Sequence, residues 1–455
     1  MNVISKNICR YWFSALPLII ILTTFLLTYY QPLLWEEEGF KNYFFRIGFY
    51  LCSIFSALWM FQHHTLLFKK GEYLRSLIIC VGAAIVFLWT YKHKITLRLD
   101  ILLILLCFVY NIVYRKWIKP DATIISFFLL ALLRLLAVFW NENHTFALEN
   151  MHEDILYYLL AVPIICLGFR IKENECLAFI TLCFKLFLFL LTLNFIAYIL
   201  ISSAWQLPFL NFFTLNKGYM TFYEVLRWST FQHPSFIAWV ILLIWGLGSF
   251  VWKKDKRLIS SVEFFLYGVL LFCFAFIVQA RVVIIGFPLT VILLIWLAIA
   301  NQWEYRRRIL IEMGLLLMGL LCVFFLVKNT TYFSDPIREQ LLSKAFENIN
   351  KHPIWGNGYG AQKIIAKEIG YYHIHNDFLA SMIDLGIIGS LLLLFWIGSI
   401  YYKTIVTKDN RLIYTLAIFL LLMNTDVLLN FHQGIYILFP FLIFIFFKDN
   451  PSSVT

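Results

Sequence analysis

Apolar runs of about 20 residues recur along almost the whole chain, and a helix of that length spans the hydrocarbon core of a bilayer. The chain has 455 residues, of which 62% are hydrophobic and only 14% are charged. A water-soluble domain cannot bury that much apolar surface. The sequence therefore predicts an all-α polytopic membrane protein and excludes a soluble enzyme.

The apolar runs predict about 12–14 membrane-spanning helices, and merging or re-entry of two short candidates would lower the number to about 11. We expect residues 1–455 to form one membrane domain, within which residues 328–374 are a long loop. The predicted spans are residues 11–30, 43–62, 76–91, 99–114, 122–140, 155–170, 177–202, 236–252, 261–280, 282–300, 309–327, 376–400, 412–430 and 434–447.

Lysine and arginine gather in alternate loops, which the positive-inside rule places in the cytoplasm together with both termini. The net charge of +11 resides largely in these clusters, so it does not indicate nucleic-acid binding. Residues 141–154 include acids but no lysine or arginine, which places that loop on the exported side. Lys92, Lys94 and Arg98 disagree with this scheme locally. The clusters are Lys69/Lys70/Arg75, Arg115/Lys116/Lys119, Arg170/Lys172, Lys253/Lys254/Lys256/Arg257, Arg306/Arg307/Arg308 and Lys403/Lys408/Arg411.

The long exported loop 328–374 contains a predicted amphipathic helix. Asp335-Pro336 is a typical helix start, with an N-cap residue followed by proline, and His352-Pro353 ends the helix. We expect this helix to lie along the membrane surface or over a cavity. Its apolar residues, which recur at helical spacing, are Ile337, Leu341, Leu342, Ala345, Phe346 and Ile349.

Four polar segments lie at predicted exported ends of spans, where polar groups kept near a bilayer often indicate function. They are residues 227–234, 279–281, 352–360 and 373–377. Each also has a purely structural explanation. The arginines of the first two could anchor helices at the headgroups. The glycines of the third permit backbone conformations closed to other residues and could form a tight turn. In the fourth, Asn376 or Asp377 could cap a helix.

The order and spacing of these segments resemble the O-antigen ligase and polymerase superfamily from about Glu224 to Gly389. Residues 227–234 resemble the family's arginine-to-proline element, and Gln279-Ala280-Arg281 resembles its arginine at the exported end of a later helix. The most distinctive pattern is His-Pro-Ile-Trp-Gly-Asn-Gly at 352–358, followed by His-Asn-Asp-Phe-Leu from His375 and Gly-Ile-Ile-Gly from Gly386. Asp384 departs from the pattern, since glutamate is common there.

The resemblance implies a glycosyltransferase with a periplasmic active site in the inner membrane of a bacterium. The donor would be a glycan on undecaprenyl diphosphate. The acceptor would be a sugar hydroxyl on lipid A-core for a ligase, which we prefer, or on a second lipid-linked repeat for a polymerase. A flippase or other transporter is the alternative from another class. A transporter would align charges along the middle of its helices, whereas Arg134, Lys185 and Asp426 form no series.

The chemistry of this transfer suggests roles for the polar residues. A departing lipid diphosphate needs positive charge, and guanidinium groups match phosphate oxygens in a bidentate way, so Arg227 and Arg281 are the catalytic candidates for this task. His375 is the candidate acceptor for the hydroxyl proton. No cysteine or histidine set has metal-site spacing, so we expect neither a metal nor a cofactor. Substrate-binding candidates are Arg338, His373, Asn376, Asp377, Gly356 and Gly358.

Overall fold

Helices make up the regular structure of the protein, and no strand occurs within the residues that the structure describes. The computed structural model confirms the predicted all-α fold class. It describes residues 3–30, 38–90, 93–114, 120–151, 169–206, 234–300, 311, 314, 336–371, 373–425, 427–429 and 432–446.

Among the described residues, five helices are long and apolar enough to cross a membrane, and several shorter apolar helices accompany them. The chain is therefore a polytopic membrane protein, as predicted. Most of the predicted spans 155–170 and 309–327 lies outside the described residues, so the total number of spans stays a prediction. The five long helices are Ile95–Tyr114, Ala122–Trp140, Glu173–Ala204, Phe236–Lys254 and Asp377–Thr407.

The chain divides into two compact units, and each unit combines stretches that are separated in sequence. Whether the chain behaves as the single membrane domain that we expected stays a prediction. Unit 1 comprises Met1–Lys116, Phe169–Thr290 and Tyr436–Thr455, and unit 2 comprises Trp117–Gly168 and Val291–Ile435.

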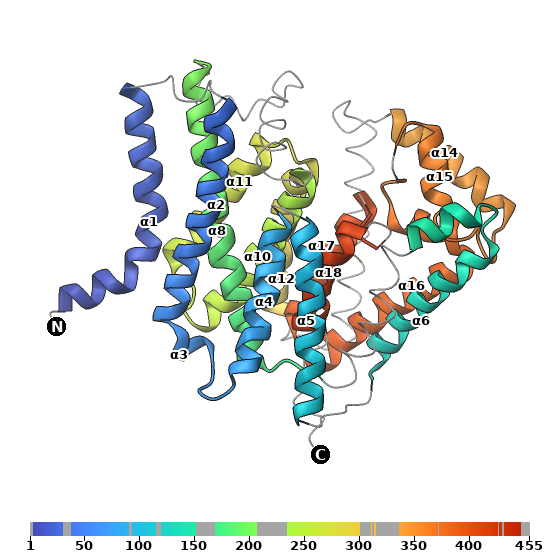
Figure 1. The fold of residues 1–455 in the computed structure, drawn as a ribbon, viewed down its shortest axis with the longest axis horizontal. Helices are drawn as coiled ribbons and strands as arrows, with labels where there is room; N and C mark the ends of the chain where they lie inside the picture. The colour runs from blue at the N-terminus through green and yellow to red at the C-terminus, as the bar shows by residue number, and fades with distance from the viewer. Residues whose placement is uncertain are drawn as a thin grey trace. The chain divides into compact units, whose positions relative to one another are not determined.

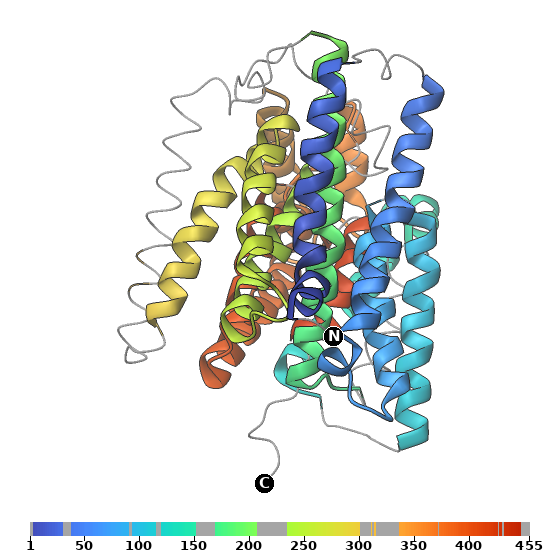
Figure 2. The same ribbon diagram turned by 90° about the vertical axis from the view of Figure 1, so that its left-hand side faces the viewer.

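Helix α8 (Glu173–Ala204) is the centre of unit 1, and Figures 1 and 2 show the helices that surround it. Nearly all of α8 is apolar and buried, which is the behaviour of a helix with neighbours on every side. The helices packed around it are α1 (Val3–Tyr30), α2 (Glu38–Gln62), α4 (Tyr73–Trp89), α10 (Pro234–Lys254) and α11 (Ser261–Ile277). Unit 1 also includes α3 (His64–Leu67), α5 (His93–Tyr114) and the π-helix η5 (Leu442–Phe446), while α12 (Arg281–Ala300) and α18 (His432–Phe441) cross the unit boundaries.

Lys185 is a buried cation in the middle of α8. Its Nζ lies 2.6 Å from Oε1 of Glu263 on α11, and it also lies 4.3 Å from the ring centroid of Trp59. A buried charge is tolerated when it has a partner of opposite charge. The ion pair with Glu263 thus explains why a lysine is buried within this span. It does not indicate the line of charges along helices that a transporter would need.

In unit 2, α6 (Ala122–Leu136) packs antiparallel to α16 (Asp377–Thr407), as Figure 1 shows. Lys403 near the end of α16 pairs with the N-cap residue of α6, Asp121, at 2.8 Å. Two turns inward, Phe127 contacts Trp396 with ring centroids 5.2 Å apart. Helix α17 (Asn410–Thr425) also packs against α16, and the short 3-10 helix η2 (Ala137–Trp140) continues α6.

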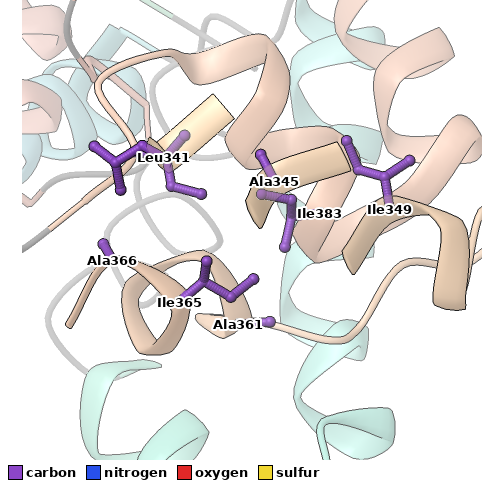
Figure 3. Close-up of a cluster of buried hydrophobic side chains, with 8 residues drawn as sticks. Leu341, Ala345, Ile349, Ala361, Ile365, Ala366 and Ile383 are labelled. Atoms are coloured by element: carbon purple, nitrogen blue, oxygen red, sulfur yellow. The ribbon is translucent and has the colours of Figure 1, made fainter. Parts of the chain in front are cut away.

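Helix α14 (Pro336–Lys351) confirms the amphipathic helix predicted in the long loop, with its expected start and end. The apolar face is narrower than predicted. Leu341, Ala345 and Ile349 are buried against α16 and a second helix that we did not predict, α15 (Ala361–Glu368), as Figure 3 shows. Leu342 and Phe346 are exposed, because the buried stripe repeats every fourth residue and a neighbour one position later points away.

Candidate active site

The glycine loop, residues 352–360, joins α14 to α15. Gly356, Gly358 and Gly360 have φ angles of 73°, 91° and 83°, which confirms that this loop uses backbone conformations closed to most residues. A methyl group on Gly356 would lie 2.5 Å from backbone atoms of α16, and one on Gly358 would lie 2.5 Å from the backbone of Asn141. These positions need glycine because backbone packs directly against backbone.

The glycine loop forms backbone hydrogen bonds with α16 where that helix is interrupted. Gly386, at φ 63° and ψ −158°, interrupts the helical backbone. The N–H of Asn357 donates to the carbonyl of Ile383 at 2.7 Å, and the N–H of Ile387 donates to the carbonyl of Pro353 at 2.9 Å. Buried backbone groups need such partners. The loop therefore replaces hydrogen bonds that a continuous helix would make within itself.

Asp384 connects α16 to the start of α15. Its buried carboxylate accepts hydrogen bonds from the backbone N–H groups of Gly360 at 3.1 Å and Gln362 at 2.9 Å. A carboxylate at a helix N-terminus is favourable because it meets free N–H groups and the positive end of the helix dipole. The side chain of Gln362 in turn accepts a hydrogen bond from the N–H of Ile374 at 3.3 Å. This chain of contacts positions the segment that carries His375.

His375 precedes α16 and has a left-handed backbone conformation, with φ 57°. Its ring is half-buried and lies 4.4 Å from the ring of His373 and 5.6 Å from the ring of Tyr371, measured between centroids. A non-glycine residue at positive φ is uncommon and is often found at functional sites. The structure thus brings the two predicted histidines together.

Asn376 is the N-cap residue of α16. Its side chain accepts a hydrogen bond from the N–H of Leu379 at 3.0 Å, so the cap is Asn376 and not Asp377. The carboxylate of Asp377 is buried and accepts hydrogen bonds from the N–H groups of Leu428 at 2.6 Å and Leu429 at 3.1 Å. Both side chains thus accept hydrogen bonds from backbone N–H groups. Direct contact of either side chain with a substrate stays a prediction.

Arg134 on α6 holds the same backbone segment as Asp377. Its Nη1 donates to the carbonyl of Leu429 at 2.6 Å, and its side chain is buried. A buried anion and a buried cation therefore secure one short stretch of non-helical backbone. The sequence singled out Arg134 as an ion within a span, and the fold gives it this structural contact.

Arg281 begins α12 directly after a tight turn. Gln279 has φ 50°, and the N–H of Ala280 donates to the carbonyl of Ala275 at 2.9 Å, a pattern typical of a Schellman helix end. Helix α11 ends at Ile277, so the predicted short connection before Arg281 is confirmed.

The glycine loop and the histidine segment both lie within a stretch of the chain that matches a known family. Residues 266–394 match the family model described as O-antigen ligase. This stretch of the chain belongs to the O-antigen ligase family. The match confirms the resemblance stated from the sequence and indicates activity of the O-antigen ligase or polymerase type. No curated protein matches the chain.

The matched O-antigen ligase stretch includes Arg281, Arg338 and His375, whereas Arg227 precedes it. Of the predicted element 227–234, Arg227 and every other residue except Pro234 lie outside the described residues. Arg338 falls in the first turn of α14, and its side chain is also outside the described part of the structure. Arg281 belongs to unit 1 and His375 to unit 2. Convergence of the three catalytic candidates therefore stays a prediction.

Asp384 and Gln362 are the site residues that sequence reasoning missed in this O-antigen ligase stretch. A carboxylate within an apolar run was the available signal for Asp384, although the sequence analysis treated it only as a departure from the family pattern. Gln362 carried no signal, since a polar residue in a loop is ordinary. Across the described residues, no three His, Cys, Asp or Glu side chains form a group that could hold a metal ion.

Proposed function

We propose that the protein transfers a glycan from undecaprenyl diphosphate to a sugar hydroxyl at the periplasmic face of a bacterial inner membrane. The observation that supports this most is the O-antigen ligase match over residues 266–394. That stretch contains the catalytic candidates Arg281 and His375 and the substrate-binding candidates Gly356 and Gly358.

The proposed reaction is a direct displacement. The acceptor hydroxyl oxygen forms a bond to the anomeric carbon of the donor sugar, and the bond from that carbon to the diphosphate oxygen breaks. His375 takes the hydroxyl proton, and undecaprenyl diphosphate leaves with the electron pair. Arg227 and Arg281 stabilise the negative charge of the leaving diphosphate, and the anomeric carbon is inverted.

The remaining site residues have supporting roles in this proposal. His373 contacts the ring of His375 and therefore influences its orientation. Asn376 and Asp377 bind backbone groups, which favours a role in positioning over direct contact with a sugar. Gly356 and Gly358 let the glycine loop approach its neighbours closely. Arg338 is proposed as a substrate contact on the basis of its charge and its place in the long loop.

The acceptor separates the two versions of this activity. A ligase uses a hydroxyl of lipid A-core, and a polymerase uses a hydroxyl of a second lipid-linked repeat. We propose the ligase, with the polymerase as the alternative. A transport function has less support, because Lys185 and Arg134 have structural partners in the fold. The proposed reaction requires neither a metal nor another cofactor.

The test is glycan transfer by purified protein in lipid nanodiscs, with an undecaprenyl-diphosphate-linked glycan as donor. Lipid A-core and a second portion of lipid-linked glycan are offered as acceptors in separate and mixed reactions. We expect the glycan on lipid A-core. Extension of the lipid-linked glycan instead identifies the polymerase, and absence of transfer to either acceptor contradicts the proposal.

A further inference from the structure

A pocket of about 480 Å³ lies in unit 2 beside the glycine loop. Its volume falls within the range of about 300–1,000 Å³ that is usual for small-molecule sites. Gly356 is the one substrate-binding candidate from the sequence among its lining residues. The residues that line it are Trp140, Glu142, His352, Trp355, Gly356 and Asn357.

Hydrogen bonds between distant segments hold the two walls of this pocket. The indole N–H of Trp140 donates to the backbone carbonyl of Trp355 at 3.1 Å. The side-chain amide of Asn141 donates to the carbonyl of Tyr359 at 2.7 Å, and the N–H of Tyr359 donates to the carbonyl of Ala137 at 3.0 Å. The end of η2 is thus joined to the glycine loop at several points. A pocket with fixed walls loses little conformational entropy when a ligand binds.

The lining of the pocket suits an uncharged sugar. The rings of Trp140 and Trp355 lie 6.0 Å apart between centroids at an angle of 72°, and Trp355 is 56% exposed. The C–H groups on one face of a pyranose ring pack on an indole surface, while its hydroxyls need acceptors and donors. Glu142 and His352 supply such groups. Among the described residues that line the pocket, there is no lysine or arginine to bind a phosphate.

We propose that this pocket binds a neutral sugar residue of the acceptor glycan. The assignment rests on the proposed glycosyl transfer. We assign the pocket to the acceptor glycan and not to the donor because the pocket and His375, the proposed base, belong to the same unit. The glycine loop contacts α16 near Asp384, about 10 Å along the helix from Asp377 at a rise of about 1.5 Å per residue. A short oligosaccharide covers that distance.

Trp355→Ala is the main variant, because it removes the exposed indole but keeps the backbone carbonyl that Trp140 needs. Glu142→Gln is the second variant, since it changes a hydrogen-bond acceptor at nearly constant size. Phe139→Ala is the matched control. Phe139 neighbours Trp140 and is 75% exposed, but it does not line the pocket.

Direct binding is measured by saturation-transfer NMR on the full chain in nanodiscs. The probes are dephosphorylated lipopolysaccharide core oligosaccharide and the oligosaccharide of one repeat unit, both free of lipid. We expect wild type and Phe139→Ala to bind at least one probe and Trp355→Ala to lose that signal. Absence of binding to wild type, or equal binding by Trp355→Ala, overturns the pocket assignment. In the second case the tryptophans serve as interfacial anchors in the bilayer.

Kinetics distinguish failure of the pocket from failure of the proposed reaction. With donor saturating, we expect Trp355→Ala to raise the KM for the acceptor about tenfold or more, the effect of losing one central aromatic contact. The KM for the donor and the kinetics of Phe139→Ala should stay within about twofold of wild type. A rise in the donor KM alone overturns the acceptor assignment. If wild type transfers no glycan but still binds oligosaccharide through Trp355, the proposed reaction fails and the sugar pocket stands.

Discussion

His375 illustrates how single residues of this protein combine structural and chemical demands. Its backbone has φ 57°, its ring contacts that of His373, and the N–H of the preceding Ile374 is held by Gln362. Strained backbone conformations persist only where the surroundings enforce them. Here the enforcing contacts lead through α15 to the buried carboxylate of Asp384. The orientation of the proposed base therefore depends on the buried side chains of Gln362 and Asp384.

Replacement of His375 by alanine tests the proposed proton transfer. We expect a loss of about 10²–10⁴-fold in the rate of transfer, which is the usual contribution of a general base. His373→Ala is the control and should lose less, since it removes a neighbour of the base and not the base. The measurement is kcat of purified variants with a lipid-linked donor. Near-normal transfer by His375→Ala would leave His375 only a role at the start of α16.

Replacement of Arg281 by lysine tests the proposed binding of the diphosphate. Lysine keeps the charge but loses the planar fork of the guanidinium group, so we expect a loss of roughly 10²–10³-fold in kcat/KM for the donor. Arg257→Lys is the control, because Arg257 is exposed and pairs with Asp255 at 2.7 Å. Equal activity of both variants would show that Arg281 has no bidentate contact with the donor.

Removal of divalent metals tests whether guanidinium groups replace a metal in the reaction. We expect transfer to continue in excess EDTA, since the positive charge in the proposed site comes from Arg227 and Arg281. The measurement is the initial rate before and after chelation. Loss of activity that magnesium or manganese restores would contradict the metal-free mechanism and require a set of metal ligands in its place.

At the scale of elements, the interrupted helix α16 organises the candidate site. Its break at Gly386 exposes backbone groups that the glycine loop binds, and its first turn carries Asn376 and Asp377. Non-helical backbone within a membrane protein is tolerated where protein surrounds it and satisfies its hydrogen bonds. The break thus connects the glycine loop to the same helix that carries the histidine segment at its start.

Replacement of Gly386 by alanine tests this role of the break. The residue combines positive φ with ψ −158°, and a methyl group there would collide with the carbonyl of Ile354, so we expect a loss of stability of about 2–5 kcal/mol. Gly398→Ala in the same helix is the control, because no atom lies within 4 Å of the added methyl group. That change should be neutral or stabilise by about 0.5–1 kcal/mol. Thermal unfolding in detergent measures both, and equal Tm values would contradict the assigned conformation of Gly386.

At the scale of the whole molecule, the orientation of the chain in the membrane decides which compartment the site faces. Two segments predicted on the exported side, residues 141–154 and the long loop, meet through the hydrogen bonds of Asn141 and Tyr359. Segments that share hydrogen bonds outside the spans must lie on the same side of the bilayer. Their contact therefore agrees with the orientation that the positive-inside rule predicts.

Cysteine labelling tests this orientation. In a background without native cysteines, Ser343→Cys places an exposed thiol on α14, in the loop predicted to be periplasmic. We expect it to react with an impermeant maleimide in intact cells whose outer membrane is permeabilised. Lys256→Cys, in the predicted cytoplasmic loop between α10 and α11, is the control and should react only after lysis. The opposite labelling pattern would reverse the topology.

The amino-acid sequence by itself determined the class of fold and much of the local structure. Runs of apolar residues predict spans because partition into lipid depends mainly on the composition of each segment. Asp335-Pro336 and His352-Pro353 predicted the ends of α14, because caps and prolines act on the adjacent backbone. The glycine and histidine motifs indicated the family for a similar reason. Each motif is a short continuous stretch of sequence, so it can be recognised without knowing the fold.

Only the tertiary structure decided which of these residues meet. The pairing of Lys185 with Glu263, the contact of Asp384 with α15 and the pocket between Trp140 and Trp355 join residues that are far apart in sequence. The same holds for Leu341, which is buried while Leu342 is exposed, since the positions of α15 and α16 select the buried stripe. Such contacts depend on how helices pack in space, and local composition carries no information about a partner on another helix.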